Sequence, residues 1–245
     1  MTSSAASRAV MPPGTESFLD SRSLAADHAN LAALLRPGMT VLDAGCGTGA
    51  ITRGIAQAVS PGGTAVGIDI NAGLIARAAA ASAGQPNLRF EEADVNAERW
   101  EAAFDLVTSA RVLQWLAVPA RAVAAMVRAA RPGGTIAVLD YDYTRAEWDP
   151  ALPPAVRRFF EAFLDWRAEA GMDNAIAAHL PRLFEQAGLT GVSGVDQREV
   201  ATAGNADYQR RIALWPGVIR PPPEGTRPPG PPTSGGPRCL LPQDA

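Results

Sequence analysis

Residues 40–49 read TVLDAGCGTG, an apolar segment that reaches an acid and runs into glycines at positions 45, 47 and 49. The apolar part predicts a buried β-strand, and the following segment AITRGIAQAV (50–59) predicts a helix. Glycine is needed where a chain turns sharply and where its backbone must approach a ligand with no Cβ in the way. The stretch therefore predicts a strand, a glycine-rich turn and a helix, with a ligand site at the carboxyl end of the strand.

Beyond this turn, strand-like and helix-like segments alternate as far as residue 143. Strands are expected at 64–70, 88–94, 104–110 and 135–143, and helices at 72–83 and 120–130. Strands separated by helices join through right-handed crossovers into a parallel sheet with both faces covered. The predicted fold class is α/β, a Rossmann-like, doubly wound, mostly parallel sheet with helices on both faces.

The segments on either side of this core are less regular. A helix is expected at 23–35, and a helical insertion follows the fifth strand. The later elements are expected to be helices at 154–171 and 175–189, a sixth strand at 192–201 and a short helix at 206–215. The aromatic face of the first of these helices (Phe159, Phe160, Phe163 and Trp166) is expected to face the core more than a substrate pocket. The Pro-rich tail offers no seventh strand.

These features divide the chain into a flexible arm, one α/β domain and a tail. The arm is expected at 1–20 and the domain at 21–220. Within the domain, 21–36 forms an N-terminal helix and 144–175 a helical substrate lid. The tail, 221–245, is expected to be either a disordered extension or the product of a frameshift.

Composition limits the functions that are open to the chain. The net charge is −3, which gives no basic footprint for nucleic acid. No apolar run approaches the roughly 20 residues that span a bilayer, and the first residues lack the apolar core of a secretory signal. All 22 basic residues are arginine, as in proteins from GC-rich bacterial genomes. Cys46 and Cys239 lie far apart, which fits the reducing cytoplasm and gives no disulfide framework. We expect a cytoplasmic bacterial protein.

The spacing of the glycines indicates which class of ligand the turn binds. A dinucleotide-binding turn has the pattern G-x-G-x-x-G, whereas here the third glycine comes one residue early. Asp43 lies inside the motif, where its charge would repel a pyrophosphate. A cationic or zwitterionic ligand is favoured over a dinucleotide.

The segment DAGCGTG (43–49) resembles the D/E-x-G-x-G-x-G signature of class I (Rossmann-like) S-adenosylmethionine-dependent methyltransferases. Four further segments continue the pattern of that family in order: GIDI (67–70), EEADVN (91–96), FDLVTSARVLQWL (104–116) and RPGGTIAVLD (131–140). The chain is most similar to the small-molecule type that includes the ubiquinone/menaquinone-biosynthesis methyltransferases.

The resemblance implies S-adenosyl-L-methionine as the cofactor, with Asp69 at its ribose hydroxyls and Asp94 at its adenine amino group. The implied cofactor-binding residues are Asp43, Gly45, Cys46, Gly47, Thr48, Gly49, Asp69, Ile70, Asp94, Val95, Ser109, Ala110 and Arg111. Cys46 is expected to contribute its backbone and not to act as a nucleophile. The alternatives are a turn acid at Asp43, a helix cap at Asp69 and an exposed loop acid at Asp94.

The chemistry that follows needs few protein groups, because a methyl sulfonium is already an activated donor. The protein must exclude water and align the acceptor, and a general base helps where the acceptor is a hydroxyl or an acidic carbon. Candidates for this base or for orienting the substrate are His28 and the run Asp140, Tyr141, Asp142 and Tyr143. Strand alternation is expected to send the two tyrosines of this run to one face and the two acids to the other. Both tyrosines have packing against the added helices as the alternative, and His179 is expected to be structural. No metal site is expected.

We expect methyl transfer to a small-molecule acceptor, at an oxygen, nitrogen or carbon atom. The alternatives are a non-catalytic S-adenosylmethionine-binding protein, an RNA or protein methyltransferase, and, more distantly, an NAD-dependent oxidoreductase. The expected partner is a small molecule, with no nucleic acid and no membrane, and the chain is expected to be a monomer or a homodimer.

Overall fold

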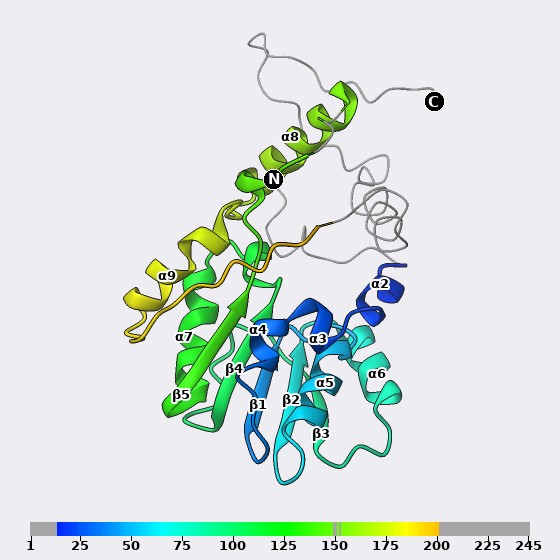
Figure 1. Cartoon of the computed structure of the whole chain (residues 1–245), viewed down its shortest axis with the longest axis vertical. Coiled ribbons are helices and arrows are strands. Elements are labelled where there is room, and N and C mark those ends of the chain that lie inside the picture. The colour runs from blue at the N-terminus through cyan, green and yellow to red at the C-terminus, as the bar shows by residue number, and fades with distance from the viewer. Residues whose placement is uncertain (1–13, 149–150, 152, 201–245) are drawn as a thin grey trace.

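The computed structural model describes residues 14–148, 151 and 153–200. They form a five-stranded parallel sheet in the order β3-β2-β1-β4-β5 (Figure 1). The strands are β1 (Thr40–Ala44), β2 (Thr64–Asp69), β3 (Leu88–Glu92), β4 (Phe104–Ala110) and β5 (Ala130–Leu139). The strand order reverses between β1 and β4, which makes the carboxyl edge beside β1 the switch point where such sheets bind ligands. The predicted doubly wound α/β fold is confirmed.

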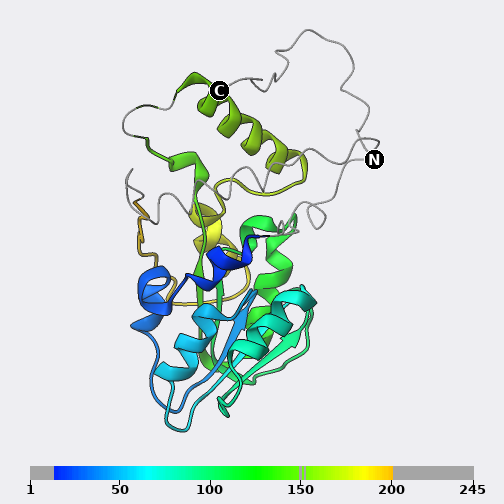
Figure 2. The same cartoon turned by 90° about the vertical axis from the view of Figure 1, so that its right-hand side faces the viewer.

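Helices cover both faces of the sheet. They are α2 (Glu16–Asp20), α3 (Leu24–Asp27), α4 (Ala29–Ala32), α5 (Ala50–Ala58), α6 (Ala72–Ala81), α7 (Pro119–Ala129), α8 (Pro154–Glu169) and α9 (Ile176–Gln186). Along β1, Val41 belongs to a cluster with Ile55 of α5, whereas its neighbour Leu42 belongs to a cluster with Met126 of α7. Figure 2 shows α5 and α7 on opposite sides of the strands. Successive side chains of a strand point to opposite faces, so a strand that is apolar throughout is buried on both.

The helix expected at 23–35 is broken into α3 and α4 at His28, whose φ is −149° and ψ is 52°. A further helix, α2, lies within the segment expected to be a flexible arm. The break turns the His28 side chain inward, where it is almost completely buried. The spacing of apolar residues in the sequence did not predict the break at His28, because the leucines of both short helices still lie on the core side.

The fifth strand begins earlier and ends earlier than the expected 135–143. An irregularity opposite Phe104 and Leu106 lets the preceding segment ARPGG join the strand. The strand ends at Leu139 because the carboxylate of the next residue, Asp140, accepts the backbone N–H groups of Tyr141 (3.1 Å) and Gln114 (3.2 Å). Tyr141, Asp142 and Tyr143 therefore follow the strand, and their orientation is not set by strand alternation.

The sixth strand expected at 192–201 is absent from its described part, since residues 192–200 form no ladder with the sheet. Side chains attach this segment instead: Gln197 Nε2 donates to the Asp27 carbonyl at 3.3 Å, and Gln197 Oε1 accepts from the Asn30 N–H at 3.5 Å. The helix expected at 206–215 and the tail at 221–245 lie outside the described residues.

The insertion after β5 contains α8, which stands away from the sheet in both views (Figures 1 and 2). Of its four aromatic residues expected to face the core, only Phe163 is buried, and the other three are half-buried. Within the described residues, no helix combines the length and the apolar character needed to cross a membrane.

Candidate functional site

The glycine turn after β1 has three residues in left-handed backbone conformations. The φ angles of Gly45, Gly47 and Gly49 are 82°, 56° and 71°. A Cβ on Gly45 would lie 2.3 Å from Val112 Cγ2, and one on Gly49 would lie 2.4 Å from Phe90 Cζ. At Gly47 the nearest atom, Leu19 Cδ1, is 3.5 Å away, an ordinary contact. Packing therefore requires glycine at positions 45 and 49, whereas at Gly47 a Cβ would make only an ordinary contact with Leu19 and the left-handed φ is what favours glycine.

The second strand ends in a carboxylate that faces this turn. Asp69 Oδ2 accepts the Gly47 N–H at 3.0 Å, and Asp69 Oδ1 accepts the Asn71 N–H at 2.9 Å. The Ile68 carbonyl accepts the N–H groups of Gly45 (2.7 Å) and Cys46 (2.8 Å), so the turn is anchored to β2. This brings together the glycines and the acid that the resemblance assigned to the ribose.

Two further residues of the motif are Asp43, which is buried below the turn, and Cys46, which is half-buried within it. Asp43 Oδ2 accepts from Thr52 Oγ1 at 2.7 Å, which connects β1 to α5. Burial, opposed by the Thr52 hydrogen bond and reinforced by the charge of Asp69, raises the pKa of Asp43 to about 6. Burial and these two acids also raise the pKa of the Cys46 thiol. A protonated thiol is a weak nucleophile, in agreement with a backbone role for Cys46.

The implied adenine side is more open. Asp94 Oδ1 accepts the backbone N–H (2.9 Å) and the Nδ2 (2.8 Å) of Asn96, so here the carboxylate shapes the local turn. Ile70 is 69% exposed, an unusual environment for a large apolar side chain at a strand end. Val95 is half-buried against the β1–β4–α7 core cluster.

The end of β4 contributes residues that the structure uses internally. Ser109 Oγ donates to the Ala44 carbonyl at 2.7 Å, which joins β4 to β1, and Ala110 packs on the core cluster beside α5. Arg111 has a φ of 62° and a buried side chain. Thr48 is buried, and its carbonyl accepts from Arg53 Nη1 at 2.9 Å.

The N-terminal helices lie over the turn. Leu19 of α2 is next to Gly47, and Asp20 pairs with Arg77 of α6 through an Nε–Oδ2 contact of 2.9 Å. These contacts place α2 beside the glycine turn.

Among the candidates for the base, His28 has a ring nitrogen with no hydrogen-bond partner among the described residues. Its Nε2 lies 3.3 Å from Thr108 Oγ1, and that hydroxyl donates its only proton to the Ala137 carbonyl at 2.8 Å. His28 Nε2 must therefore carry a proton, which leaves Nδ1 as an unprotonated acceptor. Nδ1 is buried and has no hydrogen-bond partner among the described residues. Burial and the charge of Arg111 lower the pKa of His28 to about 4, so the ring is neutral at pH 7.

The other candidates have protein partners. Tyr141 OH accepts from Arg111 Nε at 2.8 Å and donates to Glu199 Oε2 at 2.9 Å. Tyr143 OH donates to Gln114 Oε1 at 2.6 Å, and burial raises the pKa of Tyr143 well above its usual range. Its ring packs against Phe163 of α8.

Asp142 Oδ1 accepts from the backbone and hydroxyl of Thr144 at the start of the short 3₁₀ turn η2 (Tyr143–Arg145). His179 is exposed and pairs with Asp173. Within the described residues, no group of three or more His, Cys, Asp or Glu side chains could hold a metal ion.

Sequence reasoning missed a buried polar group beneath α8. Arg167 is fully buried, donates to the Gln114 carbonyl (2.7 Å) and to Asn174 Oδ1 (2.8 Å), and lies over the Tyr143 ring. Nearby, burial raises the pKa of Asp140 to about 7. The available signal was an arginine four residues after Phe163 on the apolar stripe of an amphipathic helix.

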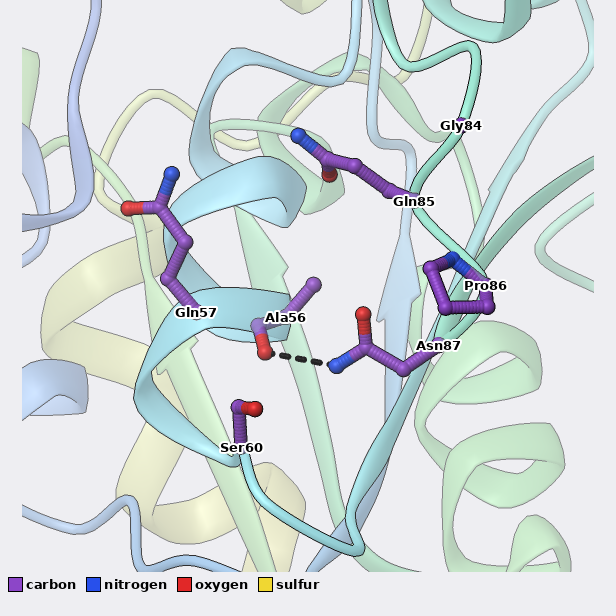
Figure 3. Close-up of a pocket in the computed structure, with 7 residues that line it drawn as sticks. All are labelled: Ala56, Gln57, Ser60, Gly84, Gln85, Pro86 and Asn87. Carbon is purple, nitrogen blue, oxygen red and sulfur yellow. Dashed lines mark hydrogen bonds between the residues drawn. The ribbon is translucent and has the colours of Figure 1, made fainter.

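A hollow of about 380 Å³ lies elsewhere, between the end of α5 and the turn before β3 (Figure 3). Its rim is joined by a 2.8 Å hydrogen bond from Asn87 Nδ2 to the Ala56 carbonyl. Because α5 runs antiparallel to the strands, this hollow lies at the amino edge of the sheet, away from the glycine turn. It is not the site that the motifs define.

Comparison with known proteins agrees with this geometry. A methyltransferase domain family matches residues 35–188. Trans-aconitate 2-methyltransferase from Deinococcus radiodurans is 40% identical over 129 residues, which cover 52% of this chain and 47% of that protein. Ubiquinone biosynthesis O-methyltransferase from Paracidovorax citrulli is 36% identical over 103 residues, 40% of this chain and 42% of that protein.

Among solved structures, a SAM-dependent methyltransferase from Aquifex aeolicus aligns with a TM-score of 0.55 at 22% identity, over 73% of this chain and 89% of that one, which shows the shared fold. The chain belongs to the methyltransferase domain family, in the class I S-adenosylmethionine-dependent group. It spans about half the length of these curated relatives.

Proposed function

We propose that the chain transfers the methyl group of S-adenosylmethionine to a small-molecule acceptor. The observation that carries this proposal is the glycine turn at the carboxyl edge of the sheet, where the Asp69 carboxylate lies 3.0 Å from the Gly47 N–H. Family membership supports the cofactor. The glycine turn fits it, because glycines let a ligand approach the backbone beside Asp69 closely.

In this proposal the carboxylate of Asp69 accepts the ribose hydroxyls, since its two oxygens match two adjacent donors. Asp94 and Val95 meet the adenine, with Ile70 covering one face of the ring. The methionine part extends along Ser109, Ala110 and Arg111. The ionised form of Asp43 provides negative charge beneath the turn.

The bound sulfonium supplies an activated methyl group, and the protein supplies alignment and a dry environment. The contact of Leu19 with Gly47 and the Asp20–Arg77 pair hold α2 over the turn, which excludes water. Where the acceptor carries a proton to be lost, His28 Nδ1 is a buried, unprotonated acceptor beside β4. Its pKa of about 4 makes it a weak base that suits an acidic acceptor.

A small molecule is favoured over a nucleic acid. The net charge of −3 provides no general attraction for phosphate backbones. The names of the relatives concern trans-aconitate and a ubiquinone precursor, both small molecules. The free thiol of Cys46 agrees with a cytoplasmic location. The proposal covers transfer to an oxygen, nitrogen or carbon atom of the acceptor.

The test uses the full chain and calorimetric titration with S-adenosylhomocysteine. Asp69→Ala is expected to lose at least about tenfold in affinity, because hydrogen bonds to a charged group contribute about 1.5–3 kcal/mol. The control Asp165→Ala, on the exposed side of α8, should bind as the parent does. Transfer of labelled methyl groups into a metabolite extract then distinguishes an enzyme from a binding protein. Equal affinities of the Asp69 variant and the parent would refute the proposal.

A further inference from the structure

Arg111 is the centre of a buried polar cluster at the carboxyl ends of β4 and β5. Its backbone N–H donates to the Leu139 carbonyl at 2.7 Å, and its side chain is only 4% exposed. The guanidinium donates to the Tyr141 hydroxyl through Nε at 2.8 Å and to the Asp27 carbonyl through Nη2 at 3.1 Å. A rigid arginine fork with a tyrosine hydroxyl beside it is suited to the two oxygens of a carboxylate.

A carboxylate from the chain itself occupies this position. Glu199 pairs through Oε1 with Arg111 Nη2, and its Oε2 accepts from Tyr141 OH at 2.9 Å. One oxygen thus meets the guanidinium and the other meets the phenol.

Glu199 comes from the segment that forms no strand. Residues 192–200 make no ladder with β5, and two of its apolar side chains, Val195 and Val200, are 71% and 74% exposed. Little apolar area therefore holds the segment in place, and its described attachments are made by side chains such as Gln197. A carboxylate presented in this way can be displaced by another of higher affinity.

The cluster adjoins the methyl-transfer site. Val112, next to Arg111, packs against Gly45 of the glycine turn. The Asp27 carbonyl accepts a hydrogen bond from Arg111, and Asp27 directly precedes His28, the candidate base. A ligand held by Arg111 would therefore lie beside the end of β4, next to the turn.

The positive charge of the guanidinium groups in this cluster requires an anion beside them. The nearby Arg22 has its pKa lowered by burial and by the positive charge of Arg111. The Asp27 carboxylate, the acid of the same segment, is engaged locally and accepts the Ser23 N–H at 2.8 Å. In addition, Arg111 Nη1 is buried with no hydrogen-bond partner among the described residues, so the guanidinium keeps a donor for a ligand. Glu199 is the carboxylate that is hydrogen-bonded to Arg111, and its charge, together with that of Asp27, opposes the lowering of the Arg22 pKa.

We infer that Arg111 and Tyr141 form the receiving site for a carboxylate group of the methyl acceptor, and that Glu199 occupies this site until the acceptor displaces it. The inference rests on the proposed function and specifies its substrate class as small organic acids. It makes Arg111 and Tyr141 residues that determine specificity. Residues 192–200, which contain Glu199, then compete with the substrate for Arg111 and Tyr141.

The test is a calorimetric titration of succinate, trans-aconitate, neutral succinamide and inorganic phosphate into the full chain, with and without saturating S-adenosylhomocysteine. Glu199→Gln removes the competing charge. The site should then bind at least one of the two carboxylates, succinate or trans-aconitate, about tenfold more tightly than in the parent. The reason is that the apparent affinity of the parent is reduced to the fraction of molecules in which Glu199 has left the site. Glu185→Gln, an exposed glutamate on α9, is the matched control and should leave affinity unchanged. Arg111→Gln should abolish carboxylate binding, and the milder Tyr141→Phe should weaken it.

Each outcome decides the matter. Tighter binding of a carboxylate, but not of succinamide or phosphate, by the Glu199 variant supports the inference. It is overturned if neither carboxylate binds this variant more tightly than the parent, or if phosphate binds equally well. It is also overturned if the substitution instead tightens S-adenosylhomocysteine, since Arg111 would then hold the cofactor's own carboxylate. Failure of S-adenosylhomocysteine to bind at all contradicts the proposed function, while the titrations without it still test the carboxylate site.

Discussion

Replacing Gly47 by alanine separates the binding role of the glycine turn from its role in folding. The new Cβ would meet only Leu19 Cδ1, at 3.5 Å, so packing adds little cost. The backbone cost arises from the φ of 56°, and a left-handed alanine costs about 1–2 kcal/mol. For a chain of this size that cost lowers Tm by about 3–6 °C. Cofactor affinity should fall much further, because the added methyl group would stand between the turn and the nucleoside that is proposed to lie against it.

Gly188→Ala is the matched control, since Gly188 has a φ of 83° and a Cβ added there would have no atom within 4 Å. Both variants should lose similar stability in thermal unfolding followed by circular dichroism. In titrations with S-adenosylhomocysteine, Gly47→Ala should lose at least about tenfold in affinity, which is about 1.4 kcal/mol, while Gly188→Ala keeps the parent value. If both variants bind equally well, the cofactor does not lie against the Gly47 backbone.

Two further predictions concern stability. Between about pH 4 and pH 7 the free energy of unfolding should fall as pH rises, because Asp43 and Asp140, with pKa values raised to about 6 and about 7, retain protons in the native state that the unfolded chain releases. His28, whose pKa is lowered to about 4, opposes this fall, but its single shift is smaller than those of the two acids together. Urea titrations across this pH window check the sign of the change in unfolding free energy. Asp140→Asn should flatten the upper part of the plot of unfolding free energy against pH. A steady rise of the unfolding free energy with pH would contradict the argument that burial raises these pKa values. Arg167→Met should cost about 2–4 kcal/mol by removing charged hydrogen bonds beneath α8. Arg157→Met, on the exposed side of the same helix, should change stability by less than about 0.5 kcal/mol, and equal losses in urea unfolding would show that Arg167 does not anchor the helix.

The elements predicted well are those whose signal is local. The strand at 40–45, the helix at 50–59 and the glycine turn between them were predicted because apolar runs, helical spacing and glycines all lie within about twenty residues. Asp69 could be assigned to the same site because parallel strands present their carboxyl ends at one edge.

The errors have identifiable physical causes. The break at His28 depends on a side chain that turns inward to Thr108, 80 residues away. The early end of β5 depends on the Asp140 carboxylate, which accepts the N–H of the next residue, Tyr141, and that of Gln114 in the turn after β4. The segment at 192–200 has strand-like residues, but its polar side chains bind other partners, and propensity does not predict such competition.

By itself, the sequence determined the layered α/β architecture and the carboxyl edge at which a ligand binds, since periodicity and glycine conformation are properties of short stretches. Only the tertiary structure decided which polar groups are already paired and which are open. Arg111 and Glu199 are 88 residues apart, and Arg167 reaches Gln114 across 53. Contacts over such separations depend on how whole elements pack against each other, and no local pattern encodes them.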